Sequence, residues 1–247
     1  MGGRGGSSGI TAKTPQQPPN AVNNVLSPQE AKDFDALSDY MAKTHNIRMG
    51  SSLKNLEFKT IQHVATTVDN LAKEFPQAVD SIRKIQAHGC PKGAYAAASF
   101  SGELMLSDYY KTFGTFNRSF THSVKTGFHP NGSNPVDSVT AHETGHLLER
   151  ALIYKNLPKG QPSYYPGMMW RKCTEAKRII SQACKDVKAT PTGKGRKVNE
   201  LINEVSRYAA KNRSECLAEC VSDYYSNGNN AKPLSKAVWN LLKKELG

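Results

Sequence analysis

Two histidines four residues apart, with a glutamate directly after the first, limit what this chain can fold into more than any other part of its sequence. The string is His142-Glu143-Thr144-Gly145-His146. Residues four apart lie on one face of an α-helix, with Cβ atoms about 5–6 Å apart. That separation suits two imidazoles that each bind one tetrahedral Zn²⁺ ion at about 2.0–2.1 Å. We therefore expect His142 and His146 to be metal ligands on one helix.

The residues around the two histidines also fit a metal site. Glu143 points slightly off the face that carries the histidines, so its carboxylate can accept a proton from a water on the metal instead of binding the metal itself. Gly145 has no side chain, and we expect it to leave room beside the metal for sheet or substrate. The helix should begin at Pro135, because Asn134 is a good N-cap and proline suits the first helical position, and it should end near Tyr154.

Two histidines do not complete such a site, since a catalytic zinc takes three protein ligands and keeps one position open. No histidine follows His146 at the spacing that the metzincin class requires, so the third ligand should be a carboxylate on a later helix. Glu215, Glu219 and Asp223 lie four residues apart in turn. Either Glu215 binds the metal and Glu219 orients a ligand imidazole, or Glu219 binds it with Asp223 behind.

Helical spacing of apolar residues and short apolar runs divide the rest of the chain into elements. We expect helices at about 27–45, 56–75, 135–154, 168–189, 198–205, 214–226 and 234–246. Short runs between Gly and Pro residues predict strands at 81–87, 94–100, 103–107 and about 122–128. Of these, Leu104–Ser107 is expected to be a free edge beside the metal helix. Helices around a small sheet indicate the α+β class.

Composition divides the chain into three regions. Residues 1–28 are rich in Gly, Ser and Pro, which predicts a disordered segment. Residues 29–80 are expected to form a helical N-terminal region, and residues 81–247 the metal-binding domain. No apolar run reaches the length of about 18 residues that spans a bilayer, and the N-terminus lacks the apolar core of a secretory signal.

Two other sets of reactive residues are expected to be structural. The five cysteines are an odd number, which favours free thiols in a reducing compartment and hence a cytoplasmic location. Cys216 and Cys220 should be small buried residues of one helix. His122 and His129 lie near the metal motif, but lone histidines are more often hydrogen-bonded structural residues.

The stretch from Tyr208 to Glu219, YAAKNRSECLAE, resembles the second half of the site in anthrax-lethal-factor-like gluzincins. In that family of zinc peptidases a tyrosine precedes the ligand glutamate by the spacing that separates Tyr208 from Glu215 here, and the glutamate opens a Glu-x-x-Ala-Glu helix. A similar arrangement, with a His-Pro-x-Gly loop before the zinc helix, occurs in zincin domains encoded near phage head-morphogenesis genes. The resemblance covers about residues 122–246.

The resemblance implies a zincin fold, with a small twisted sheet over the metal helix, a cleft below the sheet edge and a helical C-terminal half. Carried over to this sequence, it makes Glu215 the third zinc ligand. Tyr208 becomes the phenol that stabilises the oxyanion, and Glu219 a residue that orients a ligand imidazole. The chain departs from the family pattern, which favours apolar residues, at Thr144 and Cys216.

Together these features predict a zinc metalloendopeptidase that cleaves a polypeptide substrate, with Glu143 as general base. Such a protein could be phage-encoded and associated with head assembly, acting in the cytoplasm of a bacterial host or in the virion. Two alternatives use the same ligands. One is a non-catalytic phage head protein in which zinc stabilises the scaffold; the other is a toxin-type effector protease.

The net charge of +12 is concentrated in one insert. Residues 155–197 hold eleven Lys and Arg residues against two acids, Glu175 and Asp186. Such a surface can bind nucleic acid, an acidic protein or another anionic surface. The plainer alternative is a solvated, lysine-rich helix face.

Overall fold

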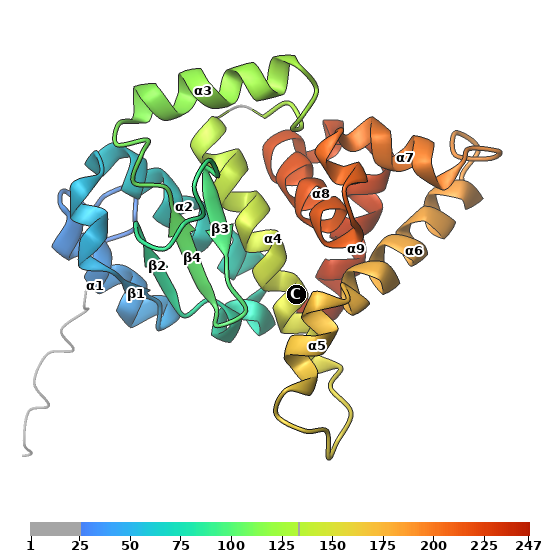
Figure 1. Cartoon of the computed structure of the whole chain (residues 1–247), viewed down its shortest axis with the longest axis horizontal. Coiled ribbons are helices and arrows are strands. Elements are labelled where there is room, and N and C mark those ends of the chain that lie inside the picture. The colour runs from blue at the N-terminus through green and yellow to red at the C-terminus, as the bar shows by residue number, and fades with distance from the viewer. Residues whose placement is uncertain (1–25, 133) are drawn as a thin grey trace, which may run out of the picture.

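The computed structural model describes residues 26–132 and 134–247, and the prediction of disorder for residues 1–25 lies outside them. The chain forms the α+β architecture of Figure 1. Its N-terminal half runs in the order α1 (Phe34–His45), β1 (Arg48–Met49), η1 (Ser51–Asn55), α2 (Phe58–Glu74), η2 (Pro76–Ser81), β2 (Lys84–Gln86), β3 (Ala96–Ala98), β4 (Glu103–Leu106) and α3 (Phe113–Lys125). The C-terminal half follows with α4 (Pro135–Lys155), α5 (Tyr165–Arg171), α6 (Thr174–Ala189), α7 (Val198–Val205), η3 (Tyr208–Ala210), α8 (Arg213–Asn227), η4 (Gly228–Asn230) and α9 (Pro233–Leu246).

The four strands form one mixed sheet in the order β1-β2-β4-β3. Strands β1, β2 and β4 are parallel, whereas β3 is antiparallel to β4, with Ala97 opposite Met105. The expected free edge at Leu104–Ser107 is therefore wrong, because β4 has a neighbour on each side. A tight turn at Gly102, whose φ is +89°, folds β3 back against β4 and makes β3 the edge beside α4 (Figure 1).

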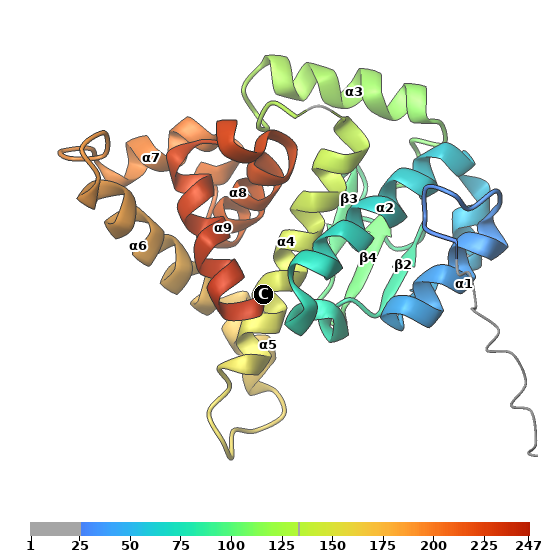
Figure 2. The same cartoon turned by 180° about the vertical axis from the view of Figure 1, so that it is seen from behind.

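Helix α4 runs between the sheet and the C-terminal helices (Figures 1 and 2). It lies between two hydrophobic cores and is buried on nearly all sides. One core joins α1, α2 and α3 to the sheet, and the other joins α4 to α6, α8 and α9. Leu147 packs in the first core and Leu148 in the second. Because both flanks of the helix are covered, the polar residues of its metal motif are largely buried.

The expected strand at 122–128 is wrong, since residues 113–125 form helix α3. Its spacing was helical rather than alternating: Phe116 and Phe120 lie four apart, and both are buried against the sheet-side core. Thr112 is the N-cap of the helix and forms a capping box with Thr115, which is a local signal for a helix start. Figure 1 shows α3 lying across the top of the sheet and α4.

Two expected helices have different bounds. The first begins at Phe34, with Asp33 as N-cap, and not at Ser27. Ser27 bonds to the Glu30 carboxylate through its N–H and its hydroxyl, but residues 28–30 form only a turn. The basic helix at 168–189 is two helices, α5 and α6, because Cys173 adopts a left-handed φ of 51° between them. The other expected helices agree with α2, α4, α7, α8 and α9 within a few residues.

No helix of the described residues is long and apolar enough to cross a membrane. The five cysteines have no disulfide partner, as expected, and Cys216 and Cys220 are buried in the helical core.

Candidate metal centre

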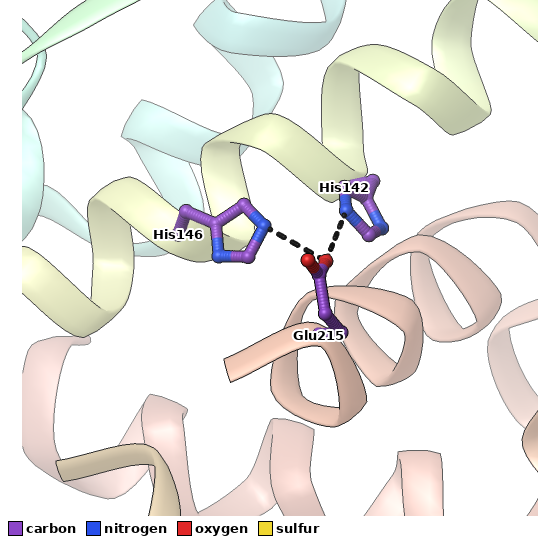
Figure 3. A group of neighbouring side chains, drawn as sticks. All are labelled: His142, His146 and Glu215. Carbon is purple, nitrogen blue, oxygen red and sulfur yellow. Dashed lines mark ion pairs between the residues drawn. The ribbon is translucent and has the colours of Figure 1, made fainter. Parts of the chain in front are cut away.

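Three side chains from two helices converge on one point beside α4 (Figure 3). His142 and His146 come from α4, and Glu215 comes from the first turn of α8. Glu215 Oε2 lies 3.2 Å from His142 Nε2 and 3.3 Å from His146 Nε2. All three residues expected from the sequence as ligands are therefore brought together.

These distances match the separation of ligand atoms around a zinc ion. With bonds of about 2.0–2.1 Å and tetrahedral angles, two ligand atoms lie about 3.3–3.4 Å apart. Glu215 Oε2 is also buried and has no hydrogen-bond partner in the described structure. A buried carboxylate oxygen without a partner is costly, and a cation between it and the two imidazoles would satisfy it. The residues present thus fit a metal ion.

Glu219 fixes the outer side of His142. Its Oε1 lies 3.0 Å from His129 Nδ1. The same oxygen lies 2.7 Å from His142 Nδ1, but this contact does not have the geometry of a hydrogen bond. Its Oε2 accepts a hydrogen bond of 2.6 Å from the Ser206 hydroxyl. Because Nδ1 of His142 faces Glu219, Nε2 of the same ring points toward the metal position. Glu219 therefore has the orienting role that we expected. The structure also brings His129 and Ser206 into the site.

His146 is held by a different pair of residues. Its Nδ1 lies 3.0 Å from Ser214 Oγ, and the Ser214 hydroxyl donates to Glu149 Oε2 at 2.5 Å. Glu149 is fully buried and also accepts the N–H of Ala176 at 3.3 Å. Neither Ser214 nor Glu149 was predicted from the sequence to belong to the site. The available signals were that Ser214 directly precedes Glu215 and that Glu149 lies one helical turn after His146.

The charges around His142 favour a cation at this point. Burial alone would lower the pKa of His142, but Glu215 and Glu219 outweigh burial and hold that pKa well above its ordinary value. The same interactions act on the acids: against the effect of burial, His142 and His146 hold the pKa of Glu215 far below its usual range. His129 and His142 likewise bring the pKa of Glu219 to about 2. A bound dication would take the place of this positive charge.

Glu143 faces open space beside the metal position. It lines both a cleft of about 540 Å³, shared with His142 and His146, and a smaller cavity of about 170 Å³. No described side chain forms a hydrogen bond or ion pair with it. The carboxylate is therefore free to exchange a proton with a molecule in the cleft.

Tyr208, the first residue of η3, lies close to Glu215 and His142. Its hydroxyl donates to Glu215 Oε1 at 3.1 Å, and its ring centroid is 5.8 Å from that of His142. Lys211 Nζ lies 3.1 Å from the same hydroxyl and 3.4 Å from Glu215 Oε1. Both Tyr208 and Lys211 line the cleft, so a phenol and an ammonium flank the place where a ligand would sit.

Gly145 has a different neighbour from the one we expected. A Cβ at this position would lie 2.8 Å from the Cα of Ala218, so the glycine makes room for α8 and not for sheet or substrate. Thr144, the polar departure from the family pattern, is fully buried and bonds back to the carbonyl of Thr140 at 2.8 Å. This internal bond satisfies its hydroxyl within the helix.

The second arrangement suggested by the sequence does not match these positions. A ligand role for Glu219 would require its carboxylate beside the two Nε2 atoms, whereas it contacts Nδ1 of His142. Asp223 does not stand behind Glu219 either. It accepts hydrogen bonds from Asn227 and from the backbone N–H of Lys232, both at 2.8 Å. The geometry favours Glu215 as the third ligand.

Comparison with models of protein families, with curated proteins and with solved structures found no match to this chain.

Proposed function

We propose that this chain is a zinc-dependent endopeptidase with a zincin-like fold. The observation that carries the proposal is the spacing of the three ligand atoms, from His142, His146 and Glu215, with the free carboxylate of Glu143 next to them. Two imidazoles and one carboxylate are a common ligand set of hydrolytic zinc. The resemblance of the stretch from Tyr208 to Glu219 to gluzincins supports the same reading.

Each residue has a chemical task in peptide hydrolysis. A zinc ion held by the three ligands supplies Lewis acidity, which lowers the pKa of a bound water and polarises a carbonyl. Glu143 accepts the proton of the attacking water at its carboxylate and passes it to the leaving nitrogen. Tyr208 donates its hydroxyl hydrogen to the oxygen on which negative charge develops, exchanging its present acceptor, Glu215 Oε1, for the substrate.

The cleft provides a place for an extended peptide. Its wall includes His142, His146 and the three residues of β3, Ala96–Ala98, which form one edge of the sheet. In an antiparallel pair, alternate residues direct their N–H and C=O groups away from the partner strand. Those of β3 that point away from β4 can pair with a substrate backbone, which would bind extended segments with little dependence on sequence.

The number of ligands favours catalysis over a scaffold role. A structural zinc site is closed by four protein ligands, whereas a catalytic site has three and an open position. In the described residues only His142, His146 and Glu215 form such a group, and all three line the cleft.

Metal analysis combined with peptide cleavage tests the proposal. The purified protein should contain about one zinc per chain and cleave casein or a mixed peptide library. Glu143→Gln should keep the zinc and the melting temperature but lose cleavage, because it removes only the proton acceptor. His146→Ala should lose the zinc. A protein that binds no zinc when it is supplied, or a Glu143→Gln variant as active as wild type, contradicts the proposal.

A further inference from the structure

The insert at residues 155–197, here called the basic arm, carries more positive charge than its fold uses. Three of its eleven cations have partners within the protein: Arg178 pairs with Glu175 and Glu245, Arg196 pairs with Glu204, and Lys155 bonds to Gln77. The other eight are exposed and form no ion pair with any described residue. These are Lys159, Arg171, Lys172, Lys177, Lys185, Lys188, Lys194 and Lys197.

The packing of the arm does not account for these eight charges. Helix α6 is held in place by its apolar face, which lies in the core shared with α8 and α9. Of the two acids in the arm, Glu175 is buried and bonded to Asn156 and Arg178, and Asp186 accepts from Gln182. Unpaired like charges close together repel one another and lower stability. Their presence therefore points to an anion outside the chain.

Three of the lysines form a row on α6. At 100° per residue, Lys177, Lys185 and Lys188 fall within a sector of about 80° on the exposed side of the helix. The first and last are separated by about 16 Å along the axis, given a rise of about 1.5 Å per residue. Phosphates of one nucleic-acid strand recur about every 3.4 Å along the duplex axis, so the row spans about five of them. Figure 1 shows α6 on the side of the molecule away from the sheet.

The composition of the arm identifies the kind of anion. Seven of the eight free cations are lysines, which act as point charges toward phosphate, whereas the cores of protein interfaces are depleted in lysine and rich in aromatic residues and arginine. Among the described residues of the arm, Tyr164 is the single exposed large apolar side chain, so apolar groups for inserting into a bilayer or a protein pocket are scarce. We propose that the basic arm binds the phosphate backbone of a nucleic acid without reading its sequence.

Titration of a fluorescently labelled 20-base-pair duplex at several salt concentrations tests this proposal. Wild-type protein should bind in low salt, and log K should fall linearly with log salt as counterions are released. Replacing Lys177, Lys185, Lys188 and Lys194 with glutamine should weaken binding at least tenfold. It should also reduce the slope by up to about 3.6, since each phosphate contact contributes about 0.9. A second duplex of unrelated sequence should give the same curve.

A matched variant distinguishes binding by the basic arm from a general effect of the protein's net charge. Lys32, Lys111, Arg118 and Lys125 are also exposed and form no ion pair with the described residues, but they lie in the N-terminal half. Replacing these four with glutamine removes the same charge and should leave both affinity and slope nearly unchanged. Equal loss in the two variants would overturn the proposal, as would polyglutamate competing as well as DNA. Glu143→Gln should bind DNA like wild type, so this result does not depend on peptidase activity.

Discussion

Gly145 on α4 lies directly against Ala218 on α8, so close that a Cβ on the glycine would be 2.8 Å from the Cα of Ala218. Ala218 is three residues after Glu215 on the same helix. The two helices therefore approach each other closely next to the side chains that converge on the metal position. The distance from the histidines to Glu215 depends on a residue that has no side chain.

Replacing Gly145 with alanine should therefore weaken metal binding. The new methyl group meets backbone, which cannot rotate away, so α8 must shift and carry Glu215 with it. Overpacking of this kind destabilises by about 1–3 kcal/mol. Zinc affinity, measured by chelator competition, and the melting temperature should both fall. Gly114→Ala is the control: it too is helical, nothing lies within 4 Å of its Cβ position, and alanine there should be neutral or stabilising. Unchanged zinc affinity in Gly145→Ala would contradict this account.

The metal helix could be predicted from the sequence because its signals are local. Asn134 caps it as expected, Pro135 is its first residue, and the two histidines follow the helical period. The sequence alone did not decide which glutamate of α8 is the third ligand, because Glu215 and Glu219 are each followed by another acid four residues later. The resemblance to a known family favoured Glu215, and the distances in the structure agree with that choice.

What the sequence did not reveal depends on contacts between distant segments. Ser214 and Glu149 hold His146 only because α8 packs across α4, 65 residues away in the chain. The turn at Gly102 places β3 at the edge of the sheet, next to β4. A run of apolar residues predicts a strand but does not predict the position of that strand in the sheet. Gly145 was correctly expected to make room, but the element that fills the room is fixed by tertiary packing.

Glu215 and Glu219 should differ in what their removal does to the metal. Glu215→Ala deletes a ligand atom and should abolish tight zinc binding. Glu219→Ala leaves the three ligands in place but frees His142 Nδ1, a loss that typically lowers affinity by about 10–100-fold. Isothermal titration or chelator competition gives the order. If Glu219→Ala were the more damaging change, Glu219 would be the ligand and Tyr208 would lose its proposed role.

Ser214→Ala should lower zinc affinity by about 10–100-fold, because it removes the acceptor that orients His146. The variant should also lose stability, since the buried Glu149 loses its hydroxyl donor. Ser226→Ala is a matched control on the same helix, where the hydroxyl bonds to Ser138 instead of a metal ligand. Its zinc affinity should equal that of wild type, and a loss as large as that of Ser214→Ala would count against the proposed chain from His146 to Glu149.

The metal-free protein should lose stability in acid partly through Glu219. Burial would raise the pKa of Glu219, but its interactions with His129 and His142 outweigh burial and hold that pKa at about 2 in the folded state. The ordinary value is 4.5. As pH falls from 4.5 toward 2, the unfolded chain binds the proton first, so the stabilisation present above pH 4.5 is lost across this range. Glu219→Gln should be less stable at neutral pH and show a shallower decline. Urea midpoints measured in chelator give both curves, and parallel curves would contradict the assignment.

Proline substitutions in β3 test how a substrate would bind. Ser99 donates its N–H to Glu103, and Ser107 donates to the carbonyl of Tyr95. The alternation of an antiparallel pair then directs the N–H and C=O groups of Ala97 toward β4 and those of Ala98 away from it, on the strand that lines the cleft. Ala98→Pro should remove a donor that no strand of the described sheet uses, and so reduce peptide cleavage while zinc content and melting temperature stay near wild type.

Ala97→Pro is the matched change one residue away, and it should break the ladder to β4 and lower the melting temperature. The two variants have the same composition, so a difference between them reports the direction of the backbone groups. If Ala98→Pro cleaves as well as wild type, the substrate does not pair with β3. If it unfolds like Ala97→Pro, the outer edge of β3 is needed for the fold itself.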